Sequence, residues 1–368
     1  MSENKLISIE ALRFISAFAI LIVHYQHFAY ENDTLSVLFN RTNQPFYDQL
    51  KFFYNLGARG VLMFWCISGF IFFYKYLKPI QNKNISAKKF FVARFSRLYP
   101  LHFATLILVL ILQAIYNYQT NTFFVYPANT LENFFYHLIF ISGWYNDGAG
   151  FNAPIWSVSI ELIVYILYFY IFFYFRTLFA FLLIIPIFLF SNYFFGSEDA
   201  TLTKCLLYFF FGGFIALIKY YPNMLTKSKN IKKNLFNFLT VFLLIFSIYL
   251  IHNRFIGSNK LEIFDGVLSL IFSGLLICLV INMNHFFIKF EKIFIFLGNL
   301  TYSSYLCHFP VQIIIIIILN ILSIDVNYQS SYLLFFYLLI TLSISAIVYR
   351  FYEYPVQNYI RSIYFKKF

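Results

Sequence analysis

Long apolar segments separated by short polar ones dominate this chain, and many of them reach about 20 residues, the length that crosses a bilayer as a helix. Ten such segments lie near residues 6–28, 54–76, 98–116, 155–174, 177–195, 202–220, 235–252, 263–283, 299–322 and 331–352. A further apolar run, 133–143, is too short to span, so we expect it to lie at the interface or to re-enter the membrane. The pattern predicts an all-α fold, a polytopic membrane bundle of about ten transmembrane helices in a single domain, 1–368.

Composition supports this fold class and settles how the net charge is interpreted. Of the 368 residues, 61% are hydrophobic and 11% are charged, against roughly 25% charged in a soluble domain. With both termini in the cytoplasm, the inner segments hold 21 of the 27 Lys and Arg residues and the outer segments hold six. This asymmetry follows the positive-inside rule, so the net charge of +12 requires no nucleic acid, and the expected partner is the lipid bilayer.

The cysteines argue against a metal or disulfide site, and the first span argues against a cleaved signal peptide. Cys66, Cys205, Cys278 and Cys307 lie in apolar runs without metal-ligand or disulfide spacing, so we expect buried thiols and no metal site. The first span is interrupted by charged residues and precedes no small-residue cleavage site, which argues against a cleaved signal peptide.

Three polar residues in the first span are the first candidates for chemistry. Arg13 and His24 are eleven residues apart, which places them on one helix face at about 16 Å along the axis. Glu10 precedes Arg13 by three residues and can pair with it. Ionisable groups inside a span usually serve a function. The alternative is that Arg13 reaches the interface and His24 marks the outer end of the span.

The span that begins near 155 carries a second buried acid. Ser157 and Glu161 lie four residues apart on one face, and Trp156 suits the outer interface. The topology places Glu161 and His24 in the outer half of the membrane. A carboxylate beside an imidazole orients it and raises its basicity, so this pair is a candidate general base.

Further candidates lie near the inner face and in the later spans. Arg94 and Arg97 share a helix face and can grip a phosphate from the cytoplasm, or they are ordinary flanking charge. Ser68 belongs to a small pair with Gly69, which permits close helix packing or leaves room for a ligand. In the ninth span Tyr302, Tyr305 and His308 precede Pro310, which would kink the helix and free carbonyl groups. The alternative is that His308 has a structural role only.

Taken in order, these stretches resemble the acyltransferase-3 family of integral-membrane acyltransferases. The elements that match run over nearly the whole chain and are Glu10, Arg13 and His24; Phe64, Trp65, Ser68 and Gly69; Arg94, Arg97 and Pro100; Trp156, Ser157 and Glu161; Gly298, Tyr302, Ser303, Tyr305 and His308; and Glu353 with Pro355. Glu10 stands where the family more often has Asp. The sequence ends without the extracytoplasmic hydrolase-like domain that some members carry, so the membrane domain alone is expected to perform the transfer.

The resemblance implies O-acetylation of a cell-envelope carbohydrate, such as O-antigen, capsule or exopolysaccharide, free or lipid-linked, in the bacterial inner membrane. It implies acetyl-CoA as co-substrate, with its phosphates held by Arg94, Arg97 and Arg13 and its pantetheine arm along the face between Arg13 and His24. His24 would deprotonate the sugar hydroxyl, with Glu161 orienting it, or would carry the acyl group itself; the sequence leaves both open.

Two rival functions remain at this level. Intramembrane Arg, Glu and His also serve transporters, for which we find no paired broken helices in matching halves. A non-catalytic assembly or sensor protein would tolerate alanine at His24 and Glu161. Consumption of acetyl-CoA by purified protein separates an enzyme from both.

Overall fold

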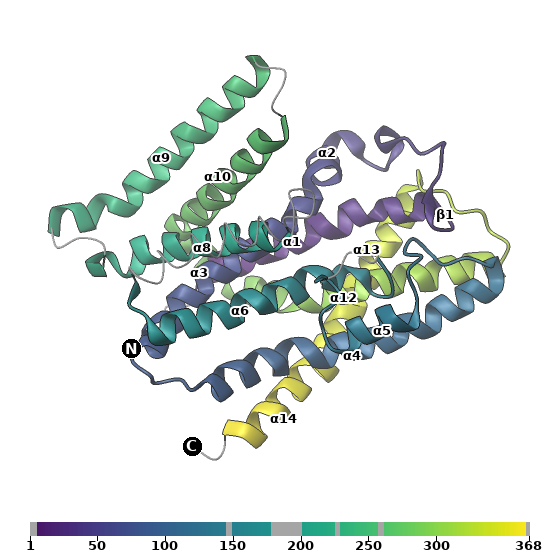
Figure 1. The fold of residues 1–368 in the computed structure, drawn as a ribbon. Coiled ribbons are helices and arrows are strands. Elements are labelled where there is room, and N and C mark those ends of the chain that lie inside the picture. The colour runs from purple at the N-terminus through teal and green to yellow at the C-terminus, as the bar shows by residue number, and fades with distance from the viewer. Residues whose placement is uncertain (1–5, 145–148, 178–200, 225–228, 257–260, 366–368) are drawn as a thin grey trace. The chain divides into compact units, whose positions relative to one another are not determined.

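The computed structural model describes residues 6–144, 149–177, 201–224, 229–256 and 261–365, and most of these residues are helical (Figure 1). The α-helices in this part of the chain are α1 (Ile7–His24), α2 (Tyr47–Leu56), α3 (Gly60–Gln81), α4 (Ala87–Thr120), α5 (Leu131–Leu138), α6 (Trp156–Tyr174), α8 (Thr201–Tyr220), α9 (Lys229–Ile256), α10 (Leu261–Asn282), α11 (Asn284–Ile288), α12 (Glu291–Ile321), α13 (Ser331–Val348) and α14 (Tyr354–Phe365). Short 3₁₀ helices are η1 (Tyr25–Ala29), η2 (Arg41–Asn43), η3 (Gly57–Arg59), η4 (Ala153–Ile155) and η5 (Pro222–Met224), and η6 (Tyr349–Glu353) is a π-helix. The strands β1 (Tyr30–Glu31) and β2 (Thr34–Leu35) pair antiparallel in a small hairpin.

The apolar pattern is confirmed as helical. Seven helical runs among the described residues are long and apolar enough to cross a membrane: Ile7–Ala29, Tyr47–Gln81, Ala87–Thr120, Ala153–Tyr174, Thr201–Tyr220, Glu291–Ile321 and Ser331–Phe365. Two shorter apolar helical segments, Asn234–Tyr249 and Gly266–Asn282, coincide with the predicted spans 235–252 and 263–283. The predicted span 177–195 lies outside the described residues, apart from Thr177. The described chain is therefore an all-α membrane bundle.

Several helices extend beyond the apolar segments that predict them. Helix α4 has 34 residues, about 50 Å of helix against a hydrocarbon core of about 30 Å. Its first turns are polar and pack against α14, where Arg361 donates to Ser96 Oγ and to Ala93 O, each at 3.2 Å. The short predicted run 133–143 begins with the eight-residue helix α5, which is too short to span.

Contacts divide the chain into two compact units, each built from three stretches. The first unit takes residues 1–13, 61–86 and 161–295, and the second takes 14–60, 87–160 and 296–368. Both α1 and α6 pass from one unit to the other along their length.

In the first unit, α3 and α8 cross at glycines. A methyl group on Gly69 would overlap with the backbone of Phe209, and one on Gly212 would overlap with the backbone of Cys66. The small pair predicted from sequence therefore serves helix packing at Gly69, because no larger residue fits this crossing.

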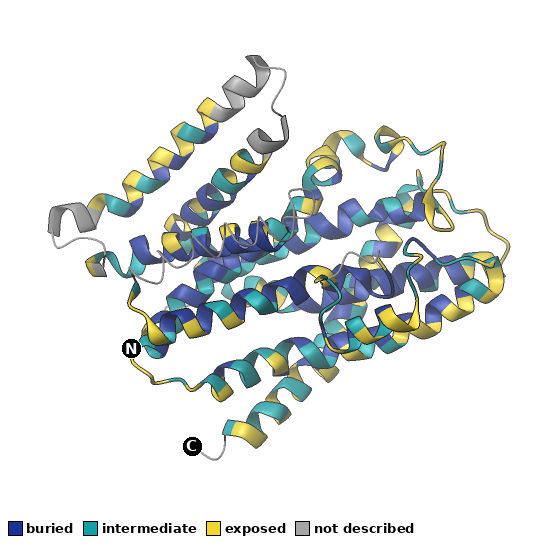
Figure 2. Ribbon diagram, in the orientation of Figure 1, coloured by how far each residue is buried: buried dark blue, intermediate teal, exposed yellow. Residues whose placement is uncertain are grey.

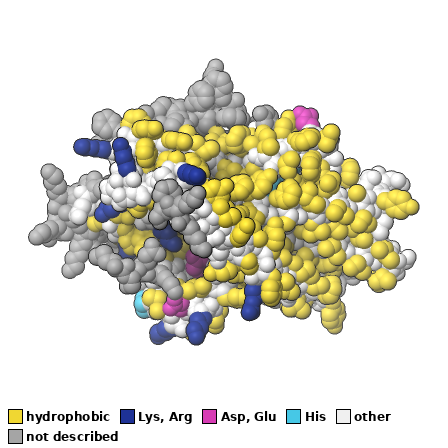
Figure 3. Space-filling view, turned by 90° about the horizontal axis from the view of Figure 1, so that it is seen from below, with side chains coloured by type: hydrophobic (Ala, Val, Ile, Leu, Met, Phe, Trp, Pro, Cys, Tyr) yellow, Lys and Arg dark blue, Asp and Glu magenta, His cyan; other side chains and the backbone are white. Residues whose placement is uncertain are grey.

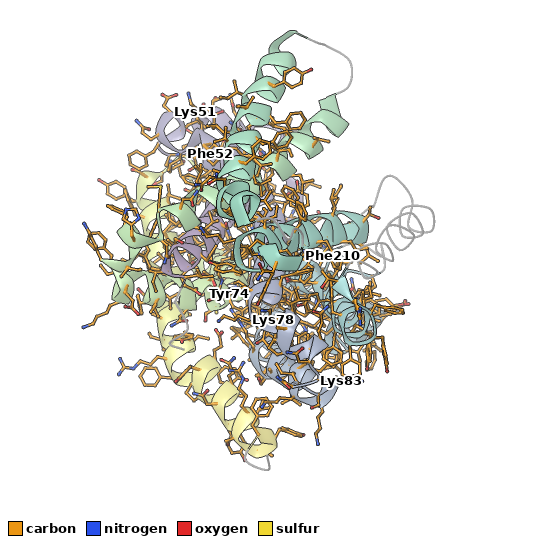
Figure 4. All side chains as sticks on the ribbon, turned by 90° about the vertical axis from the view of Figure 1, so that its left-hand side faces the viewer. Lys51, Phe52, Tyr74, Lys78, Lys83 and Phe210 are labelled. Carbon is orange, nitrogen blue, oxygen red and sulfur yellow. The ribbon has the colours of Figure 1, made fainter. Side chains whose placement is uncertain are left out.

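Two lysines, one near the end of α3 and one just after it, lie over aromatic rings. Figure 4 labels Tyr74 and Lys78 near the end of α3, and Lys83 just after it. Lys78 Nζ lies 4.8 Å from the ring centroid of Tyr221, and Lys83 Nζ lies 5.6 Å from that of Phe173. Cation–π contacts of this kind hold flanking charges in place at a helix end.

In the second unit, the end of α1 packs with α4, α12 and α13 around an aromatic core. Its fully buried members include Tyr25, Phe309 and Tyr337. Figure 2 shows α12 largely buried and α4 with a row of exposed residues. The exposed residues of α4 include Phe103, Leu108 and Ile111, and Figure 3 shows a face covered mainly by hydrophobic side chains, as expected of a surface that contacts lipid.

Candidate active site

His24 and His308 meet in the second unit although 284 residues separate them. The Nδ1 atom of His24 lies 2.8 Å from Nε2 of His308, and the two rings stack with centroids 4.9 Å apart. His308 is fully buried in the middle of α12, whereas His24, the last residue of α1, is only partly buried. The structure thus joins two candidates that the sequence treats separately.

A second polar pair flanks the first one. His27 Nδ1 lies 2.9 Å from Oε1 of Gln312, and Gln312 Nε2 donates to the carbonyl oxygen of His24 at 2.8 Å. The rings of His24 and His27 stack at 4.8 Å. Sequence reasoning missed both residues, and helical spacing could have found them, because His27 follows His24 by three residues and Gln312 follows His308 by four.

Pro310 frees a carbonyl group, as predicted, and the structure identifies the donor that replaces the lost bond. In a regular helix the N–H of residue 310 would donate to Leu306 O, which proline cannot do. Asn152, fully buried in the segment before α6, donates its Nδ2 to Leu306 O at 3.0 Å. The loop before α6 is thereby fixed to α12 one turn before Pro310, and sequence alone gives no sign of this role for Asn152.

Ser157 and Tyr305 also meet. Tyr305 donates its hydroxyl to Pro154 O at 2.6 Å, and Ser157 Oγ lies 2.9 Å from the same phenol oxygen. Because the phenol proton is used on Pro154, the serine is the donor to Tyr305. Trp156, the neighbour of Ser157, is 37% exposed, which suits the interfacial position predicted for it.

Aromatic rings pack against His27, beside the His24–His308 pair. Tyr30 and Tyr126 each contact the His27 ring edge-on at 5.7 Å, and Phe309 does so at 6.1 Å. Tyr126 lies in the loop after α4, outside the membrane-spanning runs. Removal from water, reinforced by the hydroxyls of Tyr305 and Tyr30, raises the pKa of Tyr126 above its ordinary value, so its phenol stays a neutral donor.

Comparison with known families identifies the family of the chain. The profile described as an acyltransferase domain, the acyltransferase-3 family, matches residues 6–350. The chain belongs to this family. No curated protein and no solved structure matches the chain. The matched range covers nearly the whole acyltransferase, as the resemblance from sequence motifs implies.

The predicted pair on α1 of the acyltransferase forms. Nη1 of Arg13 donates to Oε2 of Glu10 at 2.6 Å, and the Arg13 side chain is only 12% exposed. Arg13 and His24 both lie on α1, one near its beginning and one at its end. Their helical spacing of about 16 Å therefore stands, because no break interrupts the helix between them.

Arg94 and Arg97 lie one turn apart on α4, both half-buried. Arg361 of α14 binds the same turn through Ser96 and Ala93. Arg361 thus lies against the turn of α4 that carries Arg94 and Arg97, and the charge of these three guanidinium groups suits a phosphate-bearing ligand. The sequence reading counted Arg361 only as flanking charge.

The remaining candidates lie on α3, α6 and α12. Ser68 is 3.2 Å from the hydroxyl of Tyr165 in the first unit. Tyr302 is buried and donates to Leu98 O at 2.6 Å, directly after Arg97 on α4. Glu161, 8% exposed on α6, belongs to the first unit, and its expected approach to His24 of the second unit stays a prediction.

Two other observations bear on chemistry. Within the described ranges, no group of three or more His, Cys, Asp and Glu side chains could hold a metal ion. Ser303 donates to the buried carboxylate of Glu353 in η6, so this acid is tied to α12. The π-helix places Glu353 inward, in keeping with the frequent use of such helices at functional sites.

Proposed function

We propose that this acyltransferase transfers an acetyl group from cytoplasmic acetyl-CoA to a hydroxyl of a cell-envelope polysaccharide at the outer face of the bacterial inner membrane. The observation that carries the proposal is the partly buried imidazole of His24, held by His308 at the end of a helix that begins with the Glu10–Arg13 pair. Membership in the family supports the acyl transfer itself.

His24 supplies the acid–base chemistry. Its ring takes the proton of the acceptor hydroxyl while the oxygen attacks the thioester carbonyl carbon, and it gives the proton to the sulfur as the carbon–sulfur bond breaks. The proton count balances, with an acetyl ester and a free thiol as products. A transient acyl-histidine would use the same nitrogen as nucleophile and would give the same products.

The arginines supply the donor site. Coenzyme A carries several phosphate charges, and half-buried guanidinium groups bind such charges with paired hydrogen bonds. Arg94 and Arg97 would hold the phosphates from the cytoplasm together with Arg13. The separation of about 16 Å between Arg13 and His24 suits an extended pantetheine arm, and Ser68 and Tyr302 belong to the proposed lining of that path.

The acceptor would enter from the outer loops. Trp156, Ser157 and Tyr305 lie near the first turn of α6 and around Pro154, where hydroxyl and ring groups suit a sugar. Glu161 follows Ser157 by one helical turn on α6, and we assign it the carboxylate that assists His24. Either a free or a lipid-linked glycan fits this proposal. The glycan must reach this end of α6 from outside, since the donor comes from inside.

The decisive experiment measures transfer directly. Purified protein in proteoliposomes should release free thiol from acetyl-CoA only when an envelope glycan acceptor is present. Mass spectrometry of glycans from cells with and without the gene should show the added acetyl ester. Glycan uptake into vesicles without any consumption of acetyl-CoA would instead indicate a transporter.

The donor site has its own test. Arg94→Ala combined with Arg97→Ala should raise the KM for acetyl-CoA by about 10- to 100-fold, because a hydrogen bond to a charged group contributes about 1.5–3 kcal/mol. Lys51→Ala, an exposed lysine on α2 labelled in Figure 4, is the control for loss of positive charge. An unchanged KM in the double variant would reject the phosphate grip.

A further inference from the structure

The hydrogen bonds around His308 fix which of its nitrogens carries the proton. Nδ1 of His308 lies 2.7 Å from the carbonyl oxygen of Tyr305. A carbonyl oxygen can only accept, so Nδ1 of His308 carries a hydrogen. His308 is fully buried, and no described carboxylate forms an ion pair with it, so the charged ring would be costly and the neutral ring prevails. Its Nε2 therefore presents a lone pair.

This assignment sets the direction of the bond to His24. Since Nε2 of His308 accepts, the hydrogen in the 2.8 Å contact belongs to Nδ1 of His24. A neutral imidazole carries one N–H, which leaves the lone pair of His24 on Nε2. Among the residues that the structure describes, none hydrogen-bonds to this nitrogen, and His24 as a residue is only partly buried. The base of the pair is thus identified at the level of an atom.

Gln312 holds the backbone beneath the ring by the same logic. The carbonyl of His24 ends α1 and needs a donor, so the Gln312 amide must turn its Nε2 toward it. Its Oε1 then faces His27 Nδ1, which donates at 2.9 Å. Gln312 of α12 thereby fixes both the end of α1 and the tautomer of His27 in η1.

We propose that His308 is a positioning residue, which holds His24 in the tautomer whose Nε2 lone pair accepts the substrate proton. The proposal rests on the proposed function for the role of that proton. The hydroxyl proton moves to Nε2 of His24, the oxygen bonds to the acyl carbon, the carbon–sulfur bond breaks, and the proton leaves with the sulfur. While His24 is charged, its Nδ1–H stays on the lone pair of His308, which stabilises the imidazolium.

The assignment also restricts the other groups near the reaction. Among the described residues, the titratable side chains whose rings stack on His24 are His27 and His308. Because His308 occupies Nδ1, a carboxylate such as Glu161 can assist only from the side of Nε2 or at the acceptor hydroxyl. It cannot take the orienting place beside Nδ1.

Substitution of His308 separates positioning from packing. His308→Phe fills the space but cannot accept from His24, so kcat should fall on the order of 10²-fold with the KM for acetyl-CoA nearly unchanged. In His308→Gln the side-chain oxygen can accept from His24 and the amide can donate to Tyr305 O, so kcat should recover by about tenfold over His308→Phe. A packing role predicts the opposite order, because phenylalanine is the better apolar filler, and that order would overturn the proposal.

A spectroscopic measurement is independent of turnover. In protein labelled with ¹⁵N-histidine and held in lipid nanodiscs, the His24 signals are identified by their loss in His24→Asn. We expect a protonated Nδ1 and an unprotonated Nε2 in the native protein and a mixture of tautomers in His308→Phe. A native His24 protonated at Nε2 would overturn the assignment. The expected tautomer in a protein that fails to consume acetyl-CoA would support the assignment and reject the proposed function.

Discussion

Helix α12 and the helices α9 and α10 are all apolar, yet several polar side chains of α12 bond to other segments, whereas hydroxyls of α9 and α10 bond within their own helix. In α9 and α10 the hydroxyls of Thr240, Ser247 and Ser273 each donate to the carbonyl four residues earlier in their own helix. In α12, by contrast, Tyr302, Tyr305, His308 and Gln312 bond to other segments. A hydroxyl that bonds to a carbonyl of its own helix does not connect that helix to any other segment. A polar group that reaches another segment fixes two parts of the chain at once.

The largest effect should come from substitution of His24, the residue of α1 that both His308 and Gln312 of α12 contact. His24→Ala removes the base, so the rate of acetyl transfer should fall by about 10²–10⁴-fold, measured as thiol release at saturating acetyl-CoA. Ser273→Ala on α10 should leave the rate unchanged. Insertion of His24→Ala into the membrane should match that of the native protein, and native activity in this variant would exclude the base role.

The next effect should come from the carbonyl that Pro310 frees. Asn152→Leu leaves Leu306 O buried without its donor, so the free energy of unfolding should drop by about 1–3 kcal/mol. In a Pro310→Ala background the helix supplies its own N–H, and Asn152→Leu should then cost much less. Thermal unfolding of the four proteins in detergent measures this coupling. Equal costs in both backgrounds would show that the two residues act separately.

The smallest effect should come from removal of the hydroxyls that bond within their own helix. Ser247→Ala and Ser273→Ala remove bonds within one helix, so each should change the free energy of unfolding by no more than about 0.5 kcal/mol. Unfolding in the same detergent provides the measurement. A loss of several kcal/mol from either would erase the distinction between the two kinds of helix.

The sequence predicts the membrane bundle well because span length and hydropathy are local properties. It predicts the ends of the helices poorly. The span expected at 98–116 is the apolar part of a helix that runs from Ala87 to Thr120, since hydropathy does not register the polar turns that pack against α14. The ninth and tenth spans are likewise shorter than the helices that contain them.

Sequence patterns single out candidate site residues one by one but do not show their arrangement. An ionisable group in an apolar span draws attention to His24 or Glu161 by itself. Helical spacing gives the face of a residue and not its partner, so the pairing of His24 with His308 could not be read from residues 284 positions apart. Asn152 gave no such signal, because a neutral amide is unremarkable until the carbonyl that it satisfies is known, whereas Gln312 could have been found from its spacing to His308.

Asn152 donates to the carbonyl of Leu306, which is available only because residue 310 is a proline. The anchorage of the segment before α6 is thus encoded in two positions, one in that segment and one in α12. For enzyme engineering, this gives a rule for exchanging the stretch between α5 and α6 with that of another acyltransferase. The inserted stretch should keep its register against α12 when the asparagine at the position of Asn152 and the proline at the position of Pro310 are both present.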